Sequence, residues 1–494
     1  MLDHVLIWVN GRRHEVRGRE AFLSLSDYLR RALGLVGTKI VCSEGDCGAC
    51  SVLVGRASPC PFPPSELGVT GEGSRLVYRA VDSCIQFIFQ LDGTHIVTVE
   101  GLGDEAELNP VQRAIIDCHG SQCGFCTPGF VVAMTGILEE CNELDEAAMR
   151  CGLTGNLCRC TGYLPIIEAG RTIDAARHPR IESLYPSAQI LSECAGRRDE
   201  PIEIRAKWDD DEHVFMSPPC LEAALEFLGA HPDATIVAGA TDIGVRINKS
   251  LTLPRKILDL NRASELEGVA IEDGELLLGA RATWAAIEEI CEEVVPEFYK
   301  IISVFGAPQI RHAGTIGGNI ANASPIADSL PFLFVMDATL ELRSRSGART
   351  VPITEFYKGY KKFDLRPGEL IAQVRVPLPA EDERLRLYKI SRRLDLDIAS
   401  FTAAIRVRLD GEIIDDAAVA FGAVGPTVIR ARNTESYLIG RTLDEETMRA
   451  AGDVAVAEIT PISDVRGAAD YRFQLTRNVL LKFYHEMQAV AAPV

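Results

Sequence analysis

Three closely spaced cysteines near the N-terminus are the first residues whose type and spacing indicate metal chemistry. Cys42, Cys47 and Cys50 follow the pattern C-x4-C-x2-C. In ferredoxins this spacing wraps one loop around a [2Fe-2S] cluster, and the fourth cysteine comes from far downstream. Because structural zinc sites usually combine two Cys-x2-Cys arms, the four-residue gap favours iron–sulfur over zinc.

Two cysteines compete to be the fourth ligand of this first group. Cys60 lies in the proline-rich stretch Ser58–Gly73, which we expect to be an exposed insertion. Cys84 follows an apolar, strand-like stretch that would return the chain to the cysteine loop, so we predict Cys84. Within the loop, Gly45 and Gly48 let the backbone curl tightly and turn amide groups toward the cluster sulfurs.

A second group of cysteines follows in the next 80 or so residues. Cys123 and Cys126 form a Cys-x2-Cys pair, and Cys158 and Cys160 form a Cys-x-Cys pair. Four thiolates suffice for a cluster or for zinc, and the spacing alone leaves both open. Both pairs adjoin expected helix ends, where backbone amides stabilise a negatively charged cluster. The remaining cysteines are more typical of packing positions: Cys118, Cys141, Cys151, Cys194, Cys220 and Cys291.

The composition supports metal binding and excludes other classes. Of the 15 cysteines, twelve lie in the first 160 residues. Since disulfides are rare in the cytosol, this concentration indicates metal ligands. The formal net charge of -19 disfavours binding to nucleic acid or to an anionic membrane surface. The sequence has no apolar run that could span a bilayer and no basic secretory segment at its start, so we expect a cytoplasmic protein without membrane attachment.

Two glycine-rich turns in the C-terminal two-thirds are candidate phosphate-binding loops. The first, Gly239–Gly244, lacks the Lys-Ser/Thr that follows the loop of nucleotide triphosphatases. The second is Gly314–Asn319. The chain has no G-x-G-x-x-G motif, but free backbone amides in two such turns could clamp a pyrophosphate. Lys389 is most simply interpreted as a solvated strand residue.

The elements that must position these residues change in character along the chain. Val5–Val16, with a turn at Asn10-Gly11, predicts a β-hairpin. Further on, Asn109-Pro110 and Thr127-Pro128 are each a capping residue followed by proline, which predicts two helix starts. Residues 178–212 have weak periodicity, so we expect an interdomain linker there. Alternating helices and strands follow it.

Three motifs resemble the iron–sulfur domains of the molybdenum hydroxylase family. They are Cys42-Ser-Glu-Gly-Asp-Cys47-Gly-Ala-Cys50, Gln122-Cys-Gly-Phe-Cys126-Thr-Pro-Gly129 and Gly155-Asn-Leu-Cys-Arg-Cys-Thr-Gly-Tyr163. Residues 236–244, 305–328 and 369–399 resemble the flavin domain of the same family. The resemblance covers nearly the whole chain, apart from the insertion and the linker, and it argues against zinc in the second group.

The resemblance implies an α+β multidomain fold. The expected parts are a ferredoxin-like β-grasp [2Fe-2S] domain (1–98), a helical [2Fe-2S]-binding domain (99–177), the linker (178–212), an α/β FAD-binding domain of the vanillyl-alcohol-oxidase type (213–383) and an α+β C-terminal flavoprotein domain (384–494).

The resemblance also implies the cofactors, two [2Fe-2S] clusters and FAD, and the residues that hold them. The cluster ligands would be Cys42, Cys47, Cys50 and Cys84 for one cluster and Cys123, Cys126, Cys158 and Cys160 for the other. The FAD contacts would be Ile236, Val237, Ala238, Gly239, Ala240, Thr241, Asp242, Ile243, Phe305, Thr315, Ile316, Gly317, Gly318, Asn319, Asp328, Ile371 and Lys389. Asp46 stands where the family usually has glycine, and the spacing after Arg393 is shifted, near the face offered to NAD⁺.

The fused order of clusters and flavin is similar to the small subunit of bacterial two-subunit xanthine dehydrogenases. This similarity implies that a molybdopterin-binding large subunit oxidises hypoxanthine and xanthine to urate, and that electrons pass through both clusters to FAD and on to NAD⁺. We expect no catalytic residue in this chain, which has no molybdenum domain before Val494, and a dimer of heterodimers as the assembly. The alternatives are the equivalent subunit of another molybdenum hydroxylase, acting on an aldehyde or an N-heterocycle, and a self-contained flavin–iron–sulfur electron carrier.

Overall fold

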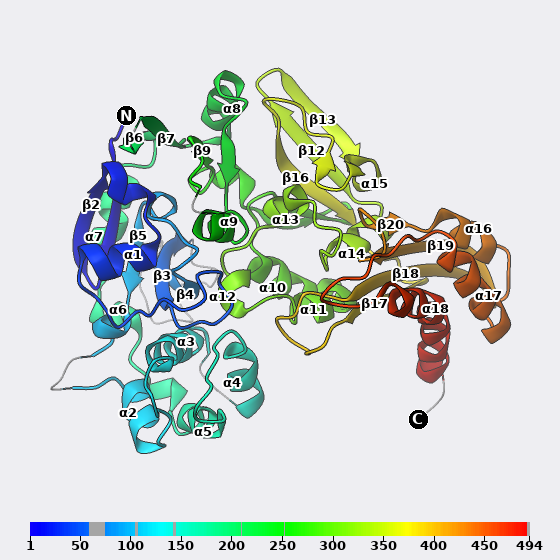
Figure 1. The fold of residues 1–494 in the computed structure, drawn as a ribbon, viewed down its shortest axis with the longest axis horizontal. Helices are drawn as coiled ribbons and strands as arrows, with labels where there is room; N and C mark the ends of the chain where they lie inside the picture. Colours follow the sequence, from blue (N-terminus) through cyan, green and yellow to red (C-terminus); the bar gives the residue numbers. More distant parts are fainter. Residues whose placement is uncertain (59–74, 104–106, 142–144, 209, 251, 492–494) are drawn as a thin grey trace. The chain divides into compact units, whose positions relative to one another are not determined.

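The structure is a computed structural model in which the polypeptide divides into two units (Figure 1). It describes residues 1–58, 75–103, 107–141, 145–208, 210–250 and 252–491. The first unit comprises Met1–Ser264 and Ala307–Gly314, and the second comprises Glu265–Gly306 and Thr315–Val494. Cys60 and most of the predicted insertion lie outside the described residues. Within the described ranges, no helix has the length and apolar character needed to cross a membrane.

The predicted N-terminal hairpin is confirmed and forms one edge of a five-stranded sheet. Asn10 and Gly11 both have positive φ, 48° and 76°, as a type I′ turn requires. The strand order is β2-β1-β5-β3-β4, with β1 and β5 parallel. The strands are β1 (His4–Val9), β2 (Arg12–Arg17), β3 (Ser51–Ser58), β4 (Arg75–Asp82) and β5 (Thr94–Val97), and the short helix α1 (Leu25–Asp27) follows β2. This mixed sheet agrees with the expected β-grasp domain.

Four helices follow this sheet in the chain. They are α2 (Pro110–Asp117), α3 (Thr127–Glu140), α4 (Glu146–Gly152) and α5 (Leu164–Arg171). Asn109 caps α2 as predicted, because its side chain accepts a hydrogen bond from the Gln112 amide at 3.0 Å. α3 was predicted to have Thr127 as its cap and Pro128 as its first helical residue. It begins one residue earlier, at Thr127, and the residue in the cap position is Cys126, whose side chain makes no capping bond. α3 lies against β3 and β4, and its Phe130 is buried with residues of the sheet.

The span predicted as a linker, residues 178–212, contains regular structure. It holds α6 (Ile181–Leu184), α7 (Ala188–Ala195) and β6 (Ile202–Trp208). β6 is the edge strand of a second sheet, of order β6-β7-β9-β8, whose other strands are β7 (Asp211–Ser217), β8 (Thr235–Val237) and β9 (Lys256–Asp259). The expected linker therefore contributes a strand to this sheet. The remaining helices of the first unit are α8 (Leu221–Ala230), α9 (Ile243–Ser250) and α12 (Pro308–Arg311).

The second unit contains two antiparallel sheets and a short hairpin. The first sheet has the order β10-β11-β16-β12-β13 and the second β17-β18-β19-β20. The strands are β10 (Val269–Glu272), β11 (Glu275–Gly279), β12 (Thr339–Ser344), β13 (Gly347–Pro352), β14 (Tyr357–Gly359), β15 (Lys362–Phe363), β16 (Leu370–Pro377), β17 (Glu383–Ile390), β18 (Phe401–Asp410), β19 (Ile413–Gly422) and β20 (Ile429–Arg430). The helices are α10 (Trp284–Val294), α11 (Pro296–Ile302), α13 (Ile316–Asn322), α14 (Leu330–Val335), α15 (Ile353–Phe356), α16 (Arg432–Leu438), α17 (Glu445–Val456) and α18 (Ala469–Ala491).

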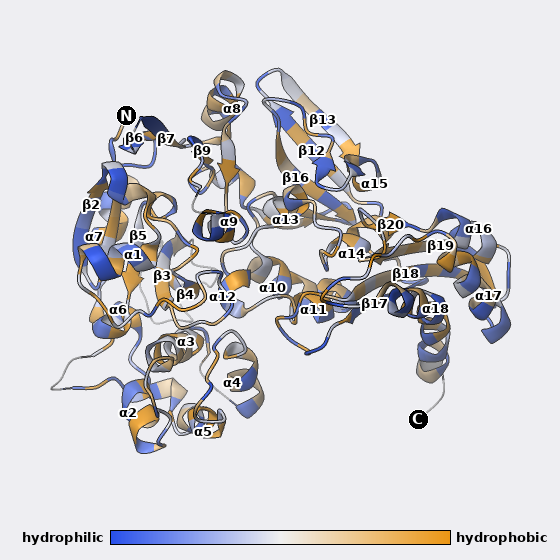
Figure 2. Ribbon diagram, viewed as in Figure 1, coloured by the Kyte–Doolittle hydropathy of each residue, from blue (hydrophilic) through white to orange (hydrophobic). Residues whose placement is uncertain are grey.

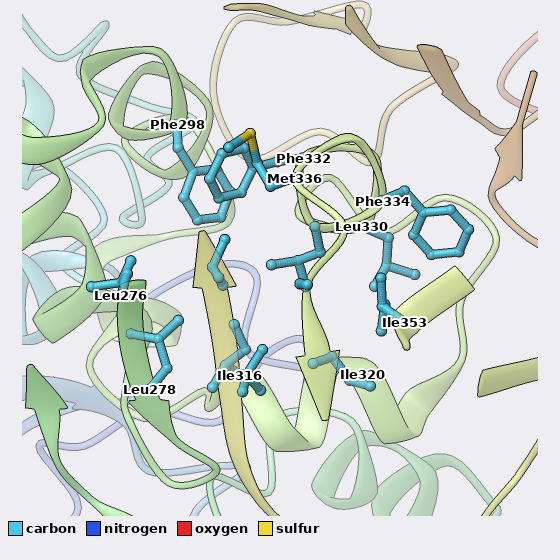
Figure 3. Close-up of a cluster of buried hydrophobic side chains, with 14 of the residues drawn as sticks. Leu276, Leu278, Phe298, Ile316, Ile320, Leu330, Phe332, Phe334, Met336 and Ile353 are labelled. Atoms are coloured by element: carbon cyan, nitrogen blue, oxygen red, sulfur yellow. The ribbon is translucent and has the colours of Figure 1, made fainter. Parts of the chain in front are cut away.

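Apolar side chains of the first of these sheets and its helices form the main core of the second unit (Figure 3). Phe298 and Phe332 stack with their ring centroids 4.0 Å apart. Ile316 and Ile320 are fully buried in this core and anchor α13, which carries the second glycine turn. α17 carries both hydrophobic and hydrophilic residues (Figure 2), as expected of a helix that buries one side.

Candidate functional site

The structure brings the four cysteines of the first group together. Cys42, Cys47 and Cys50 lie on the irregular loop before β3, and Cys84 follows β4 directly. The chain returns along β4 as predicted, since β3 and β4 pair along their whole length. The thiol of Cys42 is hydrogen-bonded to those of Cys47 and Cys84, and Cys84 is also bonded to Cys50.

The surroundings of Cys42 favour a thiolate. Hydrogen bonds from the thiols of Cys47 and Cys84, and then from the amides of Asp46 and Glu44, lower its pKa. The Asp46 amide nitrogen lies 3.5 Å from Cys42 Sγ. The pKa values of Cys47 and Cys84 are raised in turn, because Cys42 accepts their protons. Thiolates are the form of cysteine that binds metal, so the chemistry of this donor set fits an iron–sulfur cluster.

Two glycines let the loop fold as predicted. Gly45 and Gly48 have φ values of 73° and 64°, in the left-handed region that favours glycine. A Cβ atom on Gly45 would lie 2.5 Å from Ile85 Cδ1, and one on Gly48 would meet the carbonyl oxygen of Gly155. Side chains are therefore excluded at both positions.

A buried carboxylate beside this group was missed by the sequence analysis. Asp82 is 1% exposed, and its Oδ1 lies 3.5 Å from Cys50 Sγ. Burial raises the pKa of Asp82 to about 7. An aspartate at the end of an apolar strand has no spacing pattern that would have revealed it.

The second group of cysteines is also brought together. The Sγ atoms of Cys123 and Cys160 lie 3.6 Å apart, and the thiols of Cys126 and Cys158 are hydrogen-bonded. The amide of Phe125 donates to Cys123 and lowers its pKa. Cys123 and Cys160 are exposed, whereas Cys158 is buried. Cys126 directly precedes α3, as expected for a pair at a helix end.

The thiols of the first group form one connected set, and those of the second group meet in two pairs. Across the described ranges, no group of three or more His, Cys, Asp or Glu side chains is arranged to hold a metal ion. Hydrogen bonds between thiols nevertheless bring cysteines of each group into contact. A [2Fe-2S] cluster has two irons and takes four cysteine thiolates, so the four cysteines of each group match its requirement.

The first glycine turn connects β8 to α9. A Cβ atom on Gly239 would clash with the carbonyl oxygen of Ala313, so only glycine fits there. Two buried glutamines hold the turn: Gln86 Nε2 donates to the Gly239 carbonyl at 3.1 Å, and Gln90 Nε2 donates to the Ala238 carbonyl at 2.9 Å. The absence of a side chain at Gly239, in a turn that the two glutamines hold in place, allows close approach of a phosphate to the backbone.

The second glycine turn begins α13, and its amides are already used. The amides of Ile316, Gly317 and Gly318 donate to the Ala282 carbonyl, the Ala280 carbonyl and the Thr315 hydroxyl. The expectation of free amides is therefore wrong for this turn. It retains the bare backbone at Gly318, where a Cβ atom would contact only its own cap residue, and the side chain of Asn319, which accepts a hydrogen bond from Ser329 at 2.7 Å.

Asp328 and Lys389 form a buried ion pair. Lys389 Nζ lies 2.8 Å from Asp328 Oδ2, with side chains 4% and 6% exposed, and it also donates to the Val304 carbonyl. The interpretation of Lys389 as a solvated strand residue is therefore wrong. Burial raises the pKa of Asp328, and the lysine opposes this shift. Asp328 Oδ1 is buried without a hydrogen-bond partner among the described residues, so it fits a donor group on a ligand.

The two apolar residues predicted for FAD belong to the main core of the second unit. Phe305 is half-buried and lies edge-on to Trp284, with ring centroids 5.0 Å apart. Ile371, on β16, is buried. Both can offer apolar surface, and neither carries a polar group.

Four family models match successive parts of the chain. A 2Fe-2S iron–sulfur cluster binding domain matches residues 7–73, and a [2Fe-2S] binding domain matches 98–171. An FAD binding domain in molybdopterin dehydrogenase matches 210–379, and a CO dehydrogenase flavoprotein C-terminal domain matches 386–487. The match over 98–171 decides for iron–sulfur over zinc in the second group, and the four matches confirm the predicted fold class.

Similar proteins cover nearly the whole chain. Xanthine dehydrogenase 1 of Arabidopsis thaliana is 29% identical over 97% of the chain, and aldehyde oxidase 1 of Bos taurus is 30% identical over 99%. The chain spans only 39% and 40% of the length of these two relatives. A solved structure, quinoline 2-oxidoreductase from Pseudomonas putida 86, matches with a TM-score of 0.51 and 29% identity over 55% of this chain and 94% of its own. The chain belongs to the molybdenum hydroxylase family and carries its electron-transfer part, the two [2Fe-2S] domains and the flavin domains.

Proposed function

We propose that this chain is the electron-transfer subunit of an NAD-dependent xanthine dehydrogenase. A molybdopterin-binding partner chain oxidises hypoxanthine and xanthine, and this chain delivers the electrons to NAD⁺. When bound, the clusters supply single-electron transfer, and FAD converts single electrons into a hydride for the nicotinamide.

The cysteine pairs are assigned to two clusters. Cys42, Cys47, Cys50 and Cys84 hold the proximal cluster, and Cys123, Cys126, Cys158 and Cys160 hold the distal cluster. The thiol contacts and the amides directed at Cys42 and Cys123 support this assignment.

The difference in solvent exposure between the two cysteine groups supports the proposed direction of electron transfer. Cys123 and Cys160 are exposed, whereas Cys50 and Cys84 are buried. Apolar side chains beside the distal group are open to solvent too, with Phe125 51% and Leu164 64% exposed. A partner chain can cover Phe125 and Leu164, so the distal group suits electron entry.

We propose that electrons leave the proximal cluster toward the first glycine turn. Within the first unit, α9 begins next to that turn and ends against the proximal loop, where Lys249 Nζ donates to the Cys42 carbonyl at 2.8 Å. We assign FAD to Ile236–Ile243 and Thr315–Asn319, with Phe305, Asp328, Ile371 and Lys389 as further contacts. The unpartnered Asp328 Oδ1 supports this assignment.

A second substrate class is supported by the comparisons. Aldehyde oxidase 1 of Bos taurus and quinoline 2-oxidoreductase of Pseudomonas putida 86 are about as similar to this chain as the xanthine dehydrogenase is. The corresponding alternative is the same electron path with an aldehyde or an N-heterocycle as the substrate of the partner.

Copurification and anaerobic reduction test this function. A tagged chain should copurify with a molybdenum-containing large subunit, and xanthine should bleach the flavin and produce NADH. Turnover with an aldehyde or quinoline but not with xanthine would refute the xanthine assignment and favour the second class. Reduction of a dye but not of NAD⁺ would refute the acceptor. A chain that purifies without any molybdenum subunit and still reduces NAD⁺ from another donor would favour a self-contained carrier.

A further inference from the structure

Three buried polar side chains join the two cysteine loops of the first unit. Gln309, on α12, donates from Nε2 to Asn156 Oδ1 at 2.8 Å and to Ser51 Oγ at 3.3 Å. Asn156 and Ser51 then donate to one acceptor, the carbonyl oxygen of Gly48, at 3.0 and 2.8 Å. Gln309, Asn156 and Ser51 are each 2% exposed, so these hydrogen bonds are shielded from water. They form a closed ring that converges on Gly48.

The ring lies beside a direct connection between the two proposed ligand sets. The amide of Leu157 donates to the carbonyl of Cys47 at 3.0 Å. Leu157 directly precedes Cys158, and Gly48 directly follows Cys47. Cys47 of the proximal set and Cys158 of the distal set are therefore joined by a short run of covalent bonds and one hydrogen bond.

Bare backbone at this junction leaves no room for another arrangement. A Cβ atom on Gly48 would lie 2.5 Å from Asn156 Nδ2. One on Gly129 would meet the Gly48 carbonyl, and one on Gly155 would meet the side chain of Gln309. The loops approach each other this closely because each contact point is a glycine.

The helix that carries Gln309 is itself anchored to the first domain. His312, at the end of α12, bonds through Nδ1 to the Ala80 carbonyl at 2.8 Å. Ile310 packs beside the buried Cys50, Cys84 and Ile85. Because α12 is anchored by the two residues Ile310 and His312 that follow Gln309, the glutamine is held in place between both loops.

We propose that Gln309, Asn156 and Ser51 are positioning residues that fix the proximal and distal ligand sets relative to each other, with the Leu157–Cys47 hydrogen bond as the direct link between them. This inference rests on the proposed function. Electronic coupling between two centres falls steeply with distance and is larger through bonds than across a gap. The transfer concerned moves one electron from the distal to the proximal centre, so one is oxidised and the other reduced, with no bond broken and no proton moved.

The test replaces the glutamine in the full chain with its clusters. Gln309→Met keeps a similar volume and removes both donated hydrogen bonds. We expect Gln309→Met to retain its iron content and the electron paramagnetic spectrum of each cluster when that cluster alone is reduced. When both clusters are reduced, we expect the splitting of their spectra by each other to change. We expect the rate of electron transfer between the clusters to fall, because the hydrogen bonds that hold the two cysteine loops in register are lost. Gln112→Met is the control, because the hydrogen bonds of the Gln112 side chain join it to the Val99 carbonyl and the Asn109 amide, which belong to neither cysteine loop.

Each outcome bears on the inference separately from the function. Unchanged splitting and rate in Gln309→Met, or equal losses in Gln112→Met, would overturn the positioning role, as would an unsplit wild-type spectrum with both clusters reduced. If Gln309→Met loses iron, Ser51→Ala carries the same test, since it removes one hydrogen bond to Gly48 and leaves that of Asn156. Absence of iron–sulfur spectra from the wild-type chain would instead refute the proposed function.

Discussion

Asn248, on α9, donates its side-chain amide to the carbonyl oxygen of Cys84 at 2.8 Å and to that of Ser43 at 3.0 Å. Ser43 follows Cys42, so one amide group ties together both ends of the proximal ligand set. α9 has eight residues and is about 12 Å long at 1.5 Å per residue. The helix that starts at the proposed flavin turn therefore reaches the proposed cluster and holds it through Asn248.

Removing this amide should loosen the proximal cluster. In Asn248→Ala the carbonyls of Cys84 and Ser43 lose their donor, at a cost of about 1–3 kcal/mol for buried groups left unsatisfied. We expect partial loss or broadening of one electron paramagnetic spectrum, with the other intact, and a changed midpoint potential of the affected cluster. Both are measured by redox titration of the purified chain.

The neighbouring lysine provides the matched control. Lys249 also donates to the proximal loop, at the Cys42 carbonyl, but it is 51% exposed and pairs with Glu44 at 3.1 Å. Exposed pairs contribute about 0–1 kcal/mol, so Lys249→Ala should change the spectrum less than Asn248→Ala does. Equal effects of the two substitutions would show that Asn248 has no special role.

The choice of Cys84 over Cys60 can be tested directly. Cys84→Ser should abolish or strongly perturb one of the two spectra and lower the iron content from about four atoms per chain, two for each cluster. Cys60→Ser should leave both spectra intact. The reverse pattern would place the fourth ligand in the insertion and contradict the thiol contacts between Cys84 and its neighbours.

The local motifs could be predicted because the interactions that form them join residues close together in the sequence. Asn10-Gly11 could be predicted as a turn because the positive φ values of such a turn favour these residue types. Asn109-Pro110 could be predicted as a helix start because the Asn109 side chain caps the amide of Gln112. The cysteine groups were readable from spacing and from the family resemblance. These signals need no knowledge of what lies across the fold.

The remaining features depend on contacts between residues far apart in the sequence. Lys389 can be buried because Asp328, in the turn before α14, neutralises its charge. Neither Gln309 nor Asn248 belongs to a sequence motif, since each is a single side chain that donates hydrogen bonds to a loop far away in the sequence. The amides at Ile316 and Gly317 are bound to carbonyls near residue 280, which no inspection of the turn itself could reveal.

The first glycine turn should not tolerate a side chain. Gly239→Val places Cβ against the Ala313 carbonyl and forces the turn to move, so we expect loss of FAD with both clusters retained. Gly318→Val tests the second turn in the same way. Gly268→Val is the control, because a Cβ atom there meets nothing within 4 Å. Flavin and iron content are measured on each purified variant, and full flavin occupancy in both turn variants would contradict the assignment.

Removing one partner of the buried ion pair should lower the free energy of unfolding. Lys389→Met leaves Asp328 buried without its cation, and such a change costs roughly 3–5 kcal/mol of unfolding free energy. The pKa of Asp328 should rise further, because the lysine that lowers it is gone. Asp328→Asn combined with Lys389→Met should recover most of the loss, measured by urea unfolding at neutral pH. A single variant as stable as the wild type would show that the pair is not buried in solution.

Acid should destabilise the first unit through His95. This side chain is fully buried, and burial lowers its pKa to about 4. Its Nε2 accepts the Gly11 amide at 3.0 Å, so the neutral ring carries its proton on Nδ1 and donates it to Tyr78 Oη at 2.7 Å. Protonation of Nε2 would place two donors face to face and break the bond to Gly11.

The sign of the effect of His95 follows from the difference between the folded and unfolded pKa values. An unfolded histidine has a pKa of about 6.5, so below that pH the unfolded chain binds more protons than the folded one. His95 should therefore make unfolding easier as the pH falls from about 6.5 toward 4, by up to roughly 3 kcal/mol at about 1.36 kcal/mol per pKa unit. His178, whose pKa burial also lowers to about 4, should add a similar slope. We expect His95→Asn to be less stable at neutral pH and to lose stability less steeply than the wild type as the pH falls, measured by urea unfolding between pH values of about 7.5 and 5. A variant whose stability falls with pH as steeply as that of the wild type would show that His95 is not the buried neutral group.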